Sequence, residues 1–504
     1  MTDDLKTSDS SAASAAASAP GQAAPEEHYL LRISSSKYSE EDARFLRHDE
    51  RGPQRSRTSE RRLSIYQGPW ALIIGFALLI LLGGILLKLP WSAAPGQEIG
   101  WSEALFTSTS AITVTGLAVL TTGTDFSFFG QIVILLLLQI GGVGFIAFSV
   151  LLFRLIGRSV TLQTRLIVQQ SLGTQRASGV LRLALYVLGV TLTVEAIGAF
   201  LLWLRWRTTL PNDQAIWYAI FHAISSYCNA GFDLFSGTSH ATLFGYGTDW
   251  YTLLVMAGLI LIGSFGITVL YDLASFPRDR MLGLNTRFTL LMTLILTVVG
   301  VFIMLLDPIL HGLIFAGVPF FDRLAATFFT IVSARTAGLT ILPIAQLSEA
   351  TQLIIMLWMF IGGAPASMAG GVSSSTVAVL LTAVIATARG LDESVAFRRA
   401  IPAETIFKAV AIMTVSTLLV AGVTLLLALR QEGPVFQVAF EVVSAFANAG
   451  YSLDFTGELD NFGRFLIAFT MYWGRLGPLT IVVALAERSR PNFIRYPEEP
   501  IILG

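Results

Sequence analysis

Long apolar stretches alternate along the chain with shorter segments that combine aromatic residues with Ala, Ser and Thr. A helix that crosses a bilayer needs about 20 mostly apolar residues, and eight stretches are apolar enough to be spans. Their expected bounds are 69–89, 130–155, 180–203, 250–273, 288–306, 350–386, 407–429 and 462–486. The sixth stretch is longer than one span requires, so we expect an irregular element within it.

A short semi-polar segment joins the two spans of each successive pair, and the endings of these segments repeat. The four segments are WSEALFTSTSAITVTGL (101–117), AIWYAIFHAISSYCNAGF (215–232), FFDRLAATFFTIVSARTAGL (320–339) and VFQVAFEVVSAFANAGY (435–451). The nearly evenly spaced glycines of the endings VTGL, NAGF, TAGL and NAGY are Gly116, Gly231, Gly338 and Gly450. Such a period is typical of a repeated structural unit. The predicted unit is a span, a short re-entrant helix, a glycine-containing loop and a second span.

A non-helical loop at membrane depth survives only inside protein or beside water, because each unpaired backbone N–H or C=O costs several kcal/mol in hydrocarbon. Four such loops could converge on one axis, where their carbonyl groups would replace the water around a cation. Glycine suits this position because it reaches positive φ without a Cβ clash, and the negative ends of the short helices would also favour a cation. The alternative is that the four phrases are outer-face turns, since Asn-Ala-Gly is ordinary turn chemistry. Their fourfold occurrence favours the pore.

The predicted fold class is therefore an all-α membrane protein. We expect four pseudo-symmetric membrane–pore–membrane units, with eight transmembrane helices and four re-entrant pore helices, around one central pore. The units are assigned to 67–158, 178–277, 285–390 and 403–487, with a disordered cytoplasmic tail at 1–66 and a cytoplasmic C-terminal tail at 488–504.

Composition strengthens the membrane assignment, because only 13% of residues are charged and 54% are hydrophobic, whereas a soluble domain carries about 25% charged residues. The net charge of −1 gives no global basic surface for nucleic acid. The single cysteine excludes an intrachain disulfide, the five histidines are scattered, and no Walker A phrase is present. We therefore expect neither an enzyme nor a resident cofactor or metal.

Arginine and lysine residues gather before the first span, between spans two and three, four and five, and six and seven, and after the eighth span. These segments share one face if the chain crosses the membrane eight times. The positive-inside rule makes that face cytoplasmic and places both termini inside. Arg205 and Arg207, on the opposite face, are a mild exception.

The irregular element expected in the sixth stretch is IGGAPASMAGGVSSST (361–376). Pro365 lacks an N–H and clashes with the preceding turn, so the helix cannot continue unchanged; a kinked helix that fills a packing gap is the alternative. Arg475 lies within the eighth span, where a charge costs at least about 2.5–3.5 kcal/mol at mid-depth. It should face the protein interior or water, unless it reaches the interface as a snorkelling side chain.

The phrases TVTGL, SYCNAGFDLF, SARTAGLT and SAFANAGYSL, together with YWGRLGPLT (472–480), resemble those of the superfamily of Trk, Ktr and HKT potassium transporters. The chain is most similar to the Ktr-type membrane subunit, over about 67–487. The resemblance implies a K⁺ filter of backbone carbonyls. The corresponding residues are Thr113, Val114, Thr115, Gly116, Cys228, Asn229, Ala230, Gly231, Arg335, Thr336, Ala337, Gly338, Ala447, Asn448, Ala449 and Gly450. In the family, glycine at all four positions accompanies K⁺ preference, and serine at the first accompanies Na⁺ transport.

The resemblance also implies that 361–376 is an intramembrane gate loop below the filter and that Arg475 acts with it as a barrier. The gate residues are Gly362, Gly363, Ala364, Pro365, Gly370, Gly371, Ser373 and Arg475. Family members often carry a lysine after the glycine pair, whereas this chain has Val372, Ser373 and Ser374 there. The charge that anchors the loop is therefore expected to differ.

The function implied is K⁺ uptake across a bacterial plasma (inner) membrane, with the lipid bilayer as the surroundings. The partners implied are a second copy of the chain, as a homodimer, and a cytoplasmic nucleotide-binding ring of the KtrA type. Na⁺ often activates such systems. Two alternatives remain: a Na⁺-selective or poorly selective channel of the same fold, and a non-conducting receptor or scaffold.

Overall fold

The computed structural model describes residues 69–143, 180–236, 247, 249–365 and 367–477. The predicted tails at 1–66 and 488–504 lie outside the described residues. The same is true of the end of the first predicted unit, from 144, and the end of the fourth, from 478. All structural statements below concern the described residues.

Long apolar helices form where the sequence predicts spans. They are α3 (Pro69–Lys88), α6 (Phe128–Val143), α9 (Val180–Trp206), α11 (Trp250–Asp279), α12 (Leu284–Leu305), α16 (Ala403–Ala428) and α18 (Asn461–Leu476). By length and composition, four helices in the described part could each cross a membrane: Leu185–Trp206, Trp250–Arg278, Leu284–Leu305 and Ala403–Ala428. The sixth predicted span is interrupted, because α14 (Glu349–Phe360) and α15 (Ser374–Ala388) are separate helices. The predicted irregular element is thus confirmed.

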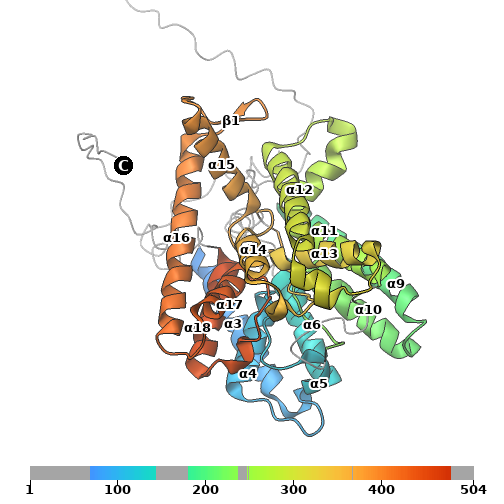
Figure 1. Ribbon diagram of the computed structural model, residues 1–504. Coiled ribbons are helices and arrows are strands. Elements are labelled where there is room, and N and C mark those ends of the chain that lie inside the picture. Colours follow the sequence, from blue (N-terminus) through green and yellow to red (C-terminus); the bar gives the residue numbers. More distant parts are fainter. Residues whose placement is uncertain (1–68, 144–179, 237–246, 248, 366, 478–504) are drawn as a thin grey trace, which may run out of the picture. The chain divides into compact units, whose positions relative to one another are not determined.

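Four shorter helices coincide with the repeated semi-polar segments: α4 (Trp101–Ile112), α10 (Asn212–Tyr227), α13 (Phe320–Thr336) and α17 (Val435–Ala447). Each short helix packs against the long helix before it and against the helix after it, for example α10 against α9 and α11. Figure 1 shows this grouping in its run of colours, with α9 to α11 in green and α16 to α18 in orange and red. The remaining elements are short. They are the one-turn helix α5 (Thr122–Asp125), the 3₁₀ turns η2 (Pro90–Ser92), η4 (Ile344–Gln346) and η5 (Thr456–Glu458), the π-helical turn η3 (Leu310–Ile314), and a hairpin of β1 (Val395–Ala396) and β2 (Arg399–Ala400). The hairpin is a small departure from the predicted all-α class.

The distribution of polar residues is reversed relative to a soluble protein. Large apolar side chains are exposed on the long helices, including Leu78 on α3, Phe302 on α12 and Leu418 on α16. Buried positions on the short helices instead carry polar groups, such as Ser110 and Ser225. An exposed apolar surface of this kind is typical of contact with lipid, and buried polar groups have to be hydrogen-bonded within the protein.

Asp307 joins the end of α12 to the start of α14. Its carboxylate accepts N–H bonds from Ile309 at 2.8 Å and Ser348 at 3.2 Å, and the Ser348 hydroxyl donates to it at 2.6 Å. Burial alone would raise the pKa of this carboxyl group, but the hydrogen bonds, led by that of Ser348, outweigh burial and hold the pKa below its usual value. The ionised form therefore stabilises the fold above the unfolded pKa of about 3.9.

We expect Asp307→Asn to lower the free energy of unfolding by about 1–3 kcal/mol at neutral pH, since it leaves donors without a charged acceptor. The difference from wild type should vanish as the pH falls through the folded pKa of Asp307. Thermal unfolding in detergent between pH 3 and pH 7 measures both effects. Glu432→Gln removes an exposed carboxylate and serves as control. Equal stability of Asp307→Asn and wild type at pH 7 would contradict this role.

Candidate functional site

The four repeated glycines lie next to one another in a closed ring. A Cβ atom built on Gly116 would lie 2.8 Å from the Cα of Gly231, and one on Gly231 would lie 3.2 Å from the Cα of Gly338. One on Gly338 would lie 3.0 Å from the Cα of Gly450, and one on Gly450 would lie 3.3 Å from the Cα of Gly116. Their φ values are +89°, +72°, +71° and +79° in chain order, as the sequence predicts for glycine at these positions. The four endings therefore meet at one place in the structure and are not separate from one another.

Carbonyl oxygens complete the ring, each supplied by the residue before a glycine. A Cβ on Gly116 would lie 2.8 Å from the carbonyl oxygen of Ala230, and one on Gly338 would lie 2.9 Å from that of Ala449. The same relation joins Gly231 to the oxygen of Ala337, at 2.8 Å. The oxygen of Thr115 lies against Gly450 in the same way. A side chain on any of the four glycines would thus collide with a carbonyl group of the neighbouring loop.

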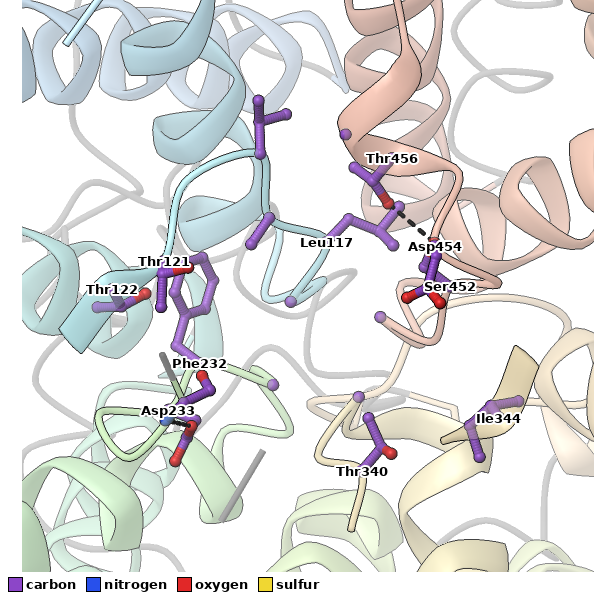
Figure 2. A pocket seen from close by; sticks show the side chains of 18 of the residues that line it. Leu117, Thr121, Thr122, Phe232, Asp233, Thr340, Ile344, Ser452, Asp454 and Thr456 are labelled. Carbon is purple, nitrogen blue, oxygen red and sulfur yellow. Dashed lines mark hydrogen bonds between the residues drawn. The ribbon is translucent and has the colours of Figure 1, made fainter. Parts of the chain in front are cut away.

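A pocket of about 210 Å³ opens beside the ring and is lined by all four glycines. Figure 2 shows that its side-chain lining comes from the segments that follow each glycine, with Leu117, Phe232, Thr340 and Ser452 arranged around it. The other lining residues follow the glycines in the chain, whereas the short helices precede them.

Three of the four loops enter the ring through a left-handed residue. Val114, Asn229 and Asn448 each stand two positions before a ring glycine and have φ of +54°, +58° and +51°. Asparagine tolerates this conformation, whereas it is strained for a β-branched residue such as valine. In the third loop the equivalent residue, Thr336, is still the last residue of α13, and Ala337 follows with φ of −117°. The loops are therefore not equivalent.

Several of the other predicted filter side chains contact one another within and between the loops. The hydroxyl groups of Thr113 and Thr115 lie 2.7 Å apart, and the amide of Asn448 donates to the Thr115 hydroxyl at 2.8 Å. The Thr336 hydroxyl donates to the side-chain oxygen of Asn229 at 3.1 Å. Cys228 is buried, and its thiol lies 3.7 Å from the carboxyl group of Glu195 on α9. These side chains tie the first loop to the fourth and the second to the third.

The segment 361–373 between α14 and α15 forms a loop whose neck is closed by backbone bonds. Gly362 donates to the carbonyl of Val372 at 2.9 Å, and Val372 donates to that of Phe360 at 3.2 Å. A Cβ on Gly371 would lie 3.2 Å from the Cα of Ala447, so this loop lies directly against the fourth ring loop. Ser373 caps α15 by accepting the N–H of Thr376. We call residues 361–373 the intramembrane loop below.

Two arginines from other elements reach this loop. Arg475 on α18 donates to the carbonyl of Met368 and to that of Gly141 on α6, with a longer bond of 3.5 Å to the carbonyl of Gly142. Arg335, at the end of α13, donates to the carbonyl of Gly362 at 3.3 Å. Arg475 thus faces the interior, and snorkelling to the interface is excluded. The loop has no lysine of its own. Its contacts with positive charge come instead from Arg335 and Arg475, which lie on other elements.

A third element that contacts the intramembrane loop, α11, was not predicted from the sequence. The helix α11 is broken at Gly266, with φ of 71° and ψ of 160°, and two of its carbonyl groups are free to accept bonds from the loop. Ala364 donates to the carbonyl of Ser264 at 2.9 Å, and Met368 donates to that of Gly263 at 3.3 Å. The phrase GSFG (263–266) within the fourth predicted span is the signal that could have revealed this break.

Two buried side chains of short helices, His222 on α10 and Glu441 on α17, join these helices to the segments that follow the ring glycines. His222 lies 2.8 Å from the carboxylate of Asp233, and Glu441 accepts a bond from Ser452 at 2.8 Å. Asp233 is also bound by the N–H of Ser236 at 2.7 Å, and its side chain is buried. Asp233 also lines the pocket beside the ring, so its bond with His222 joins α10 to the pocket wall.

The chain is similar in sequence to known cation transport proteins. A family model described as "Cation transport protein", TrkH, matches residues 78–495. The Ktr system potassium uptake protein B of Bacillus subtilis is 37% identical over 436 residues, which cover 86% of this chain and 96% of the relative. The potassium/sodium uptake protein NtpJ of Enterococcus hirae is 35% identical over 451 residues, which cover 88% and 98%.

A solved structure also resembles the fold. The crystal structure of the potassium transporter TrkH from Vibrio parahaemolyticus superposes with a TM-score of 0.63 at 20% identity, covering 84% of this chain and 86% of that one. Within the described residues, no three His, Cys, Asp or Glu side chains gather as a possible metal site.

Proposed function

Because the chain belongs to the TrkH family of cation transport proteins, we propose that it carries K⁺ into a bacterial cell across the plasma membrane. Family membership makes it a transporter and not an enzyme. The observation that carries the K⁺ proposal is the ring of four glycines, each facing a carbonyl oxygen of the next loop. Such oxygens can replace the hydration shell of a K⁺ ion.

In this proposal the four groups of helices are pseudo-symmetric membrane–pore–membrane units around one conduction axis. The short helices α4, α10, α13 and α17 direct their C-terminal ends towards the ring, and the partial negative charge of these ends favours a cation there. K⁺ enters the pocket from outside, loses water at the carbonyl groups and meets the intramembrane loop. The inward-negative potential contributes about 2.3 kcal/mol per charge per 100 mV towards uptake.

The intramembrane loop is the gate, and Arg475 holds it closed while placing a positive charge in the path of the ion. We expect the resting assembly to be a homodimer of this chain on a cytoplasmic nucleotide-binding ring, which moves the loop. Both termini then face the cytoplasm. The naming of the Bacillus subtilis relative as protein B of a Ktr system supports a multi-component assembly.

The experiment that tests this function is ⁸⁶Rb⁺ uptake into proteoliposomes, with and without the regulatory partner, nucleotide and Na⁺. Concentrative uptake that depends on the membrane potential is expected. If the purified protein gives no flux with its partner present, the non-conducting receptor or scaffold is the correct function.

Sodium transport is the second candidate, favoured by the similarity to a potassium/sodium uptake protein. We expect Gly116→Ser to lower the preference for K⁺ over Na⁺ by at least about tenfold, or about 1.4 kcal/mol. The added Cβ would lie 2.8 Å from the Ala230 oxygen and would distort the ring. Uptake of ⁸⁶Rb⁺ and ²²Na⁺ measures the ratio.

The matched control is Gly96→Ser, since Gly96 has nearly the same φ, +84°, but nothing within 4 Å of a built Cβ. This control should retain the wild-type ratio. A wild-type protein that already takes up Na⁺ as well as Rb⁺ would make the Na⁺-selective or poorly selective alternative correct.

A further inference from the structure

Arg335 belongs to the third ring loop by sequence, yet its side chain does not line the ring. It is 2% exposed, its Nη2 donates to the carbonyl of Gly362, and its Nε has no hydrogen-bond partner among the described residues. In the part of the chain that the structure describes, it forms no salt bridge. A buried guanidinium with so few partners is costly, so its place at this point requires a reason.

The residues equivalent to Arg335, three before a ring glycine, are Thr113, Cys228 and Ala447. All are small, and in each of those loops the next residue is left-handed. Only the loop with the arginine keeps a right-handed backbone up to Ala337. The exceptional side chain and the exceptional backbone conformation therefore coincide in one loop.

The contact made by Arg335 lies at a sensitive point. Gly362 forms the neck of the intramembrane loop through its bond to Val372, while Arg475 binds the loop further along, at Met368. Any movement of the loop that shifts Gly362 must therefore break or drag the Arg335 bond. The last turn of α13 would feel this movement directly, because Arg335 is part of it.

We propose that Arg335 is a positioning residue that couples the intramembrane loop to the ion-binding ring. While the intramembrane loop stays bound to Arg335, this arginine keeps the third ring loop in its right-handed form. When the loop moves and frees Arg335, Thr336 takes the left-handed conformation of its three counterparts and the ring acquires its full K⁺ affinity. This inference rests on the proposed K⁺ function and adds the residue that links gate and filter.

Linkage makes the proposal testable without a partner protein. If freeing Arg335 improves the ring for K⁺, then K⁺ binding and loop release favour each other by the same factor. We expect Arg335→Gln to raise the K⁺ affinity of the purified chain in nanodiscs by at least about fivefold, the lower end of typical coupling factors. The readouts are ⁸⁶Rb⁺ binding with K⁺ competition and the K⁺-dependent rise of the unfolding temperature.

A second variant acts on the backbone and leaves Arg335 in place. Asparagine stands at the position of Thr336 in the second and fourth loops and is left-handed there. Thr336→Asn should therefore favour the left-handed form and also raise K⁺ affinity. If Arg335→Gln does not accumulate as folded protein, the K⁺ affinity of Thr336→Asn alone tests the proposal. Arg430→Gln, which changes an exposed arginine paired with Asp460, should leave K⁺ affinity unchanged.

A double-mutant cycle tests whether the effect passes through the loop. Arg475→Gln removes the other anchor of the loop, so in that background Arg335→Gln should add little. Additive effects, or K⁺ affinity that is unchanged or lower in both Arg335→Gln and Thr336→Asn, would overturn the coupling. A wild-type chain and variants that all fail to bind K⁺ would refute the proposed function itself.

Discussion

Replacing Gly450 with alanine is expected to abolish K⁺ uptake while leaving the protein folded. The new Cβ would overlap the carbonyl oxygen of Thr115 and lie 2.9 Å from the Cα of Gly338, and both neighbours are backbone atoms that cannot rotate away. The φ of +79° adds strain, which costs of order 1–3 kcal/mol for a residue that has a Cβ. Uptake of ⁸⁶Rb⁺ at matched protein levels should fall at least about 100-fold, equivalent to about 2.8 kcal/mol.

Gly317→Ala separates ring geometry from backbone strain. Gly317 has φ of +77°, and a built Cβ on it meets nothing within 4 Å. It carries the same conformational cost without the collision, so it should retain uptake. Normal uptake by Gly450→Ala would show that the ring of glycines is not the conduction path.

The second large effect is expected from Arg475→Gln. Hydrogen bonds from a charged group contribute about 1.5–3 kcal/mol each, and Arg475 donates to the loop at Met368 and to α6 at Gly141. Loss of the bond to the loop should favour the open state by more than tenfold. We therefore expect ⁸⁶Rb⁺ uptake by this variant in the absence of any partner protein, under conditions where the wild type is silent.

Arg475→Lys retains the charge but cannot bind two carbonyl groups in the same fork geometry. We expect its ⁸⁶Rb⁺ uptake without a partner protein to lie between those of wild type and Arg475→Gln. The size of this uptake separates the effect of losing the charge from the effect of losing the hydrogen-bond geometry. A stable, well-folded Arg475→Gln that remains silent without the partner would contradict the role of this residue in holding the loop closed.

Much of this architecture follows from local sequence. Spans of about 20 apolar residues can form only a few structures in lipid, so the long helices were predictable, as was the break at Pro365. The glycine ring was predictable because the same phrase occurs at one place in each unit. Gly116 and its three counterparts then reveal by their positive φ why no other residue is suitable.

What the sequence could not supply depends on contacts between distant segments. The break at Gly266 reads as an ordinary glycine in a span, and its meaning appears only when Ala364, 98 positions later in the sequence, donates to Ser264. The contact between His222 and Asp233 likewise appears only in the structure. The repeat predicted four pseudo-symmetric units, whereas the third loop differs in backbone conformation and carries Arg335, whose partner Gly362 lies in the intramembrane loop.

The four ring loops belong to one continuous polypeptide. In a channel assembled from four identical chains, every substitution is present in all four loops at once. A harmful change therefore acts four times. Here a mutation alters one loop and leaves three intact, so one loop can acquire a separate task while the other three keep theirs. The third ring loop, which alone keeps a right-handed backbone up to Ala337, differs from the other three as such a division of tasks would require.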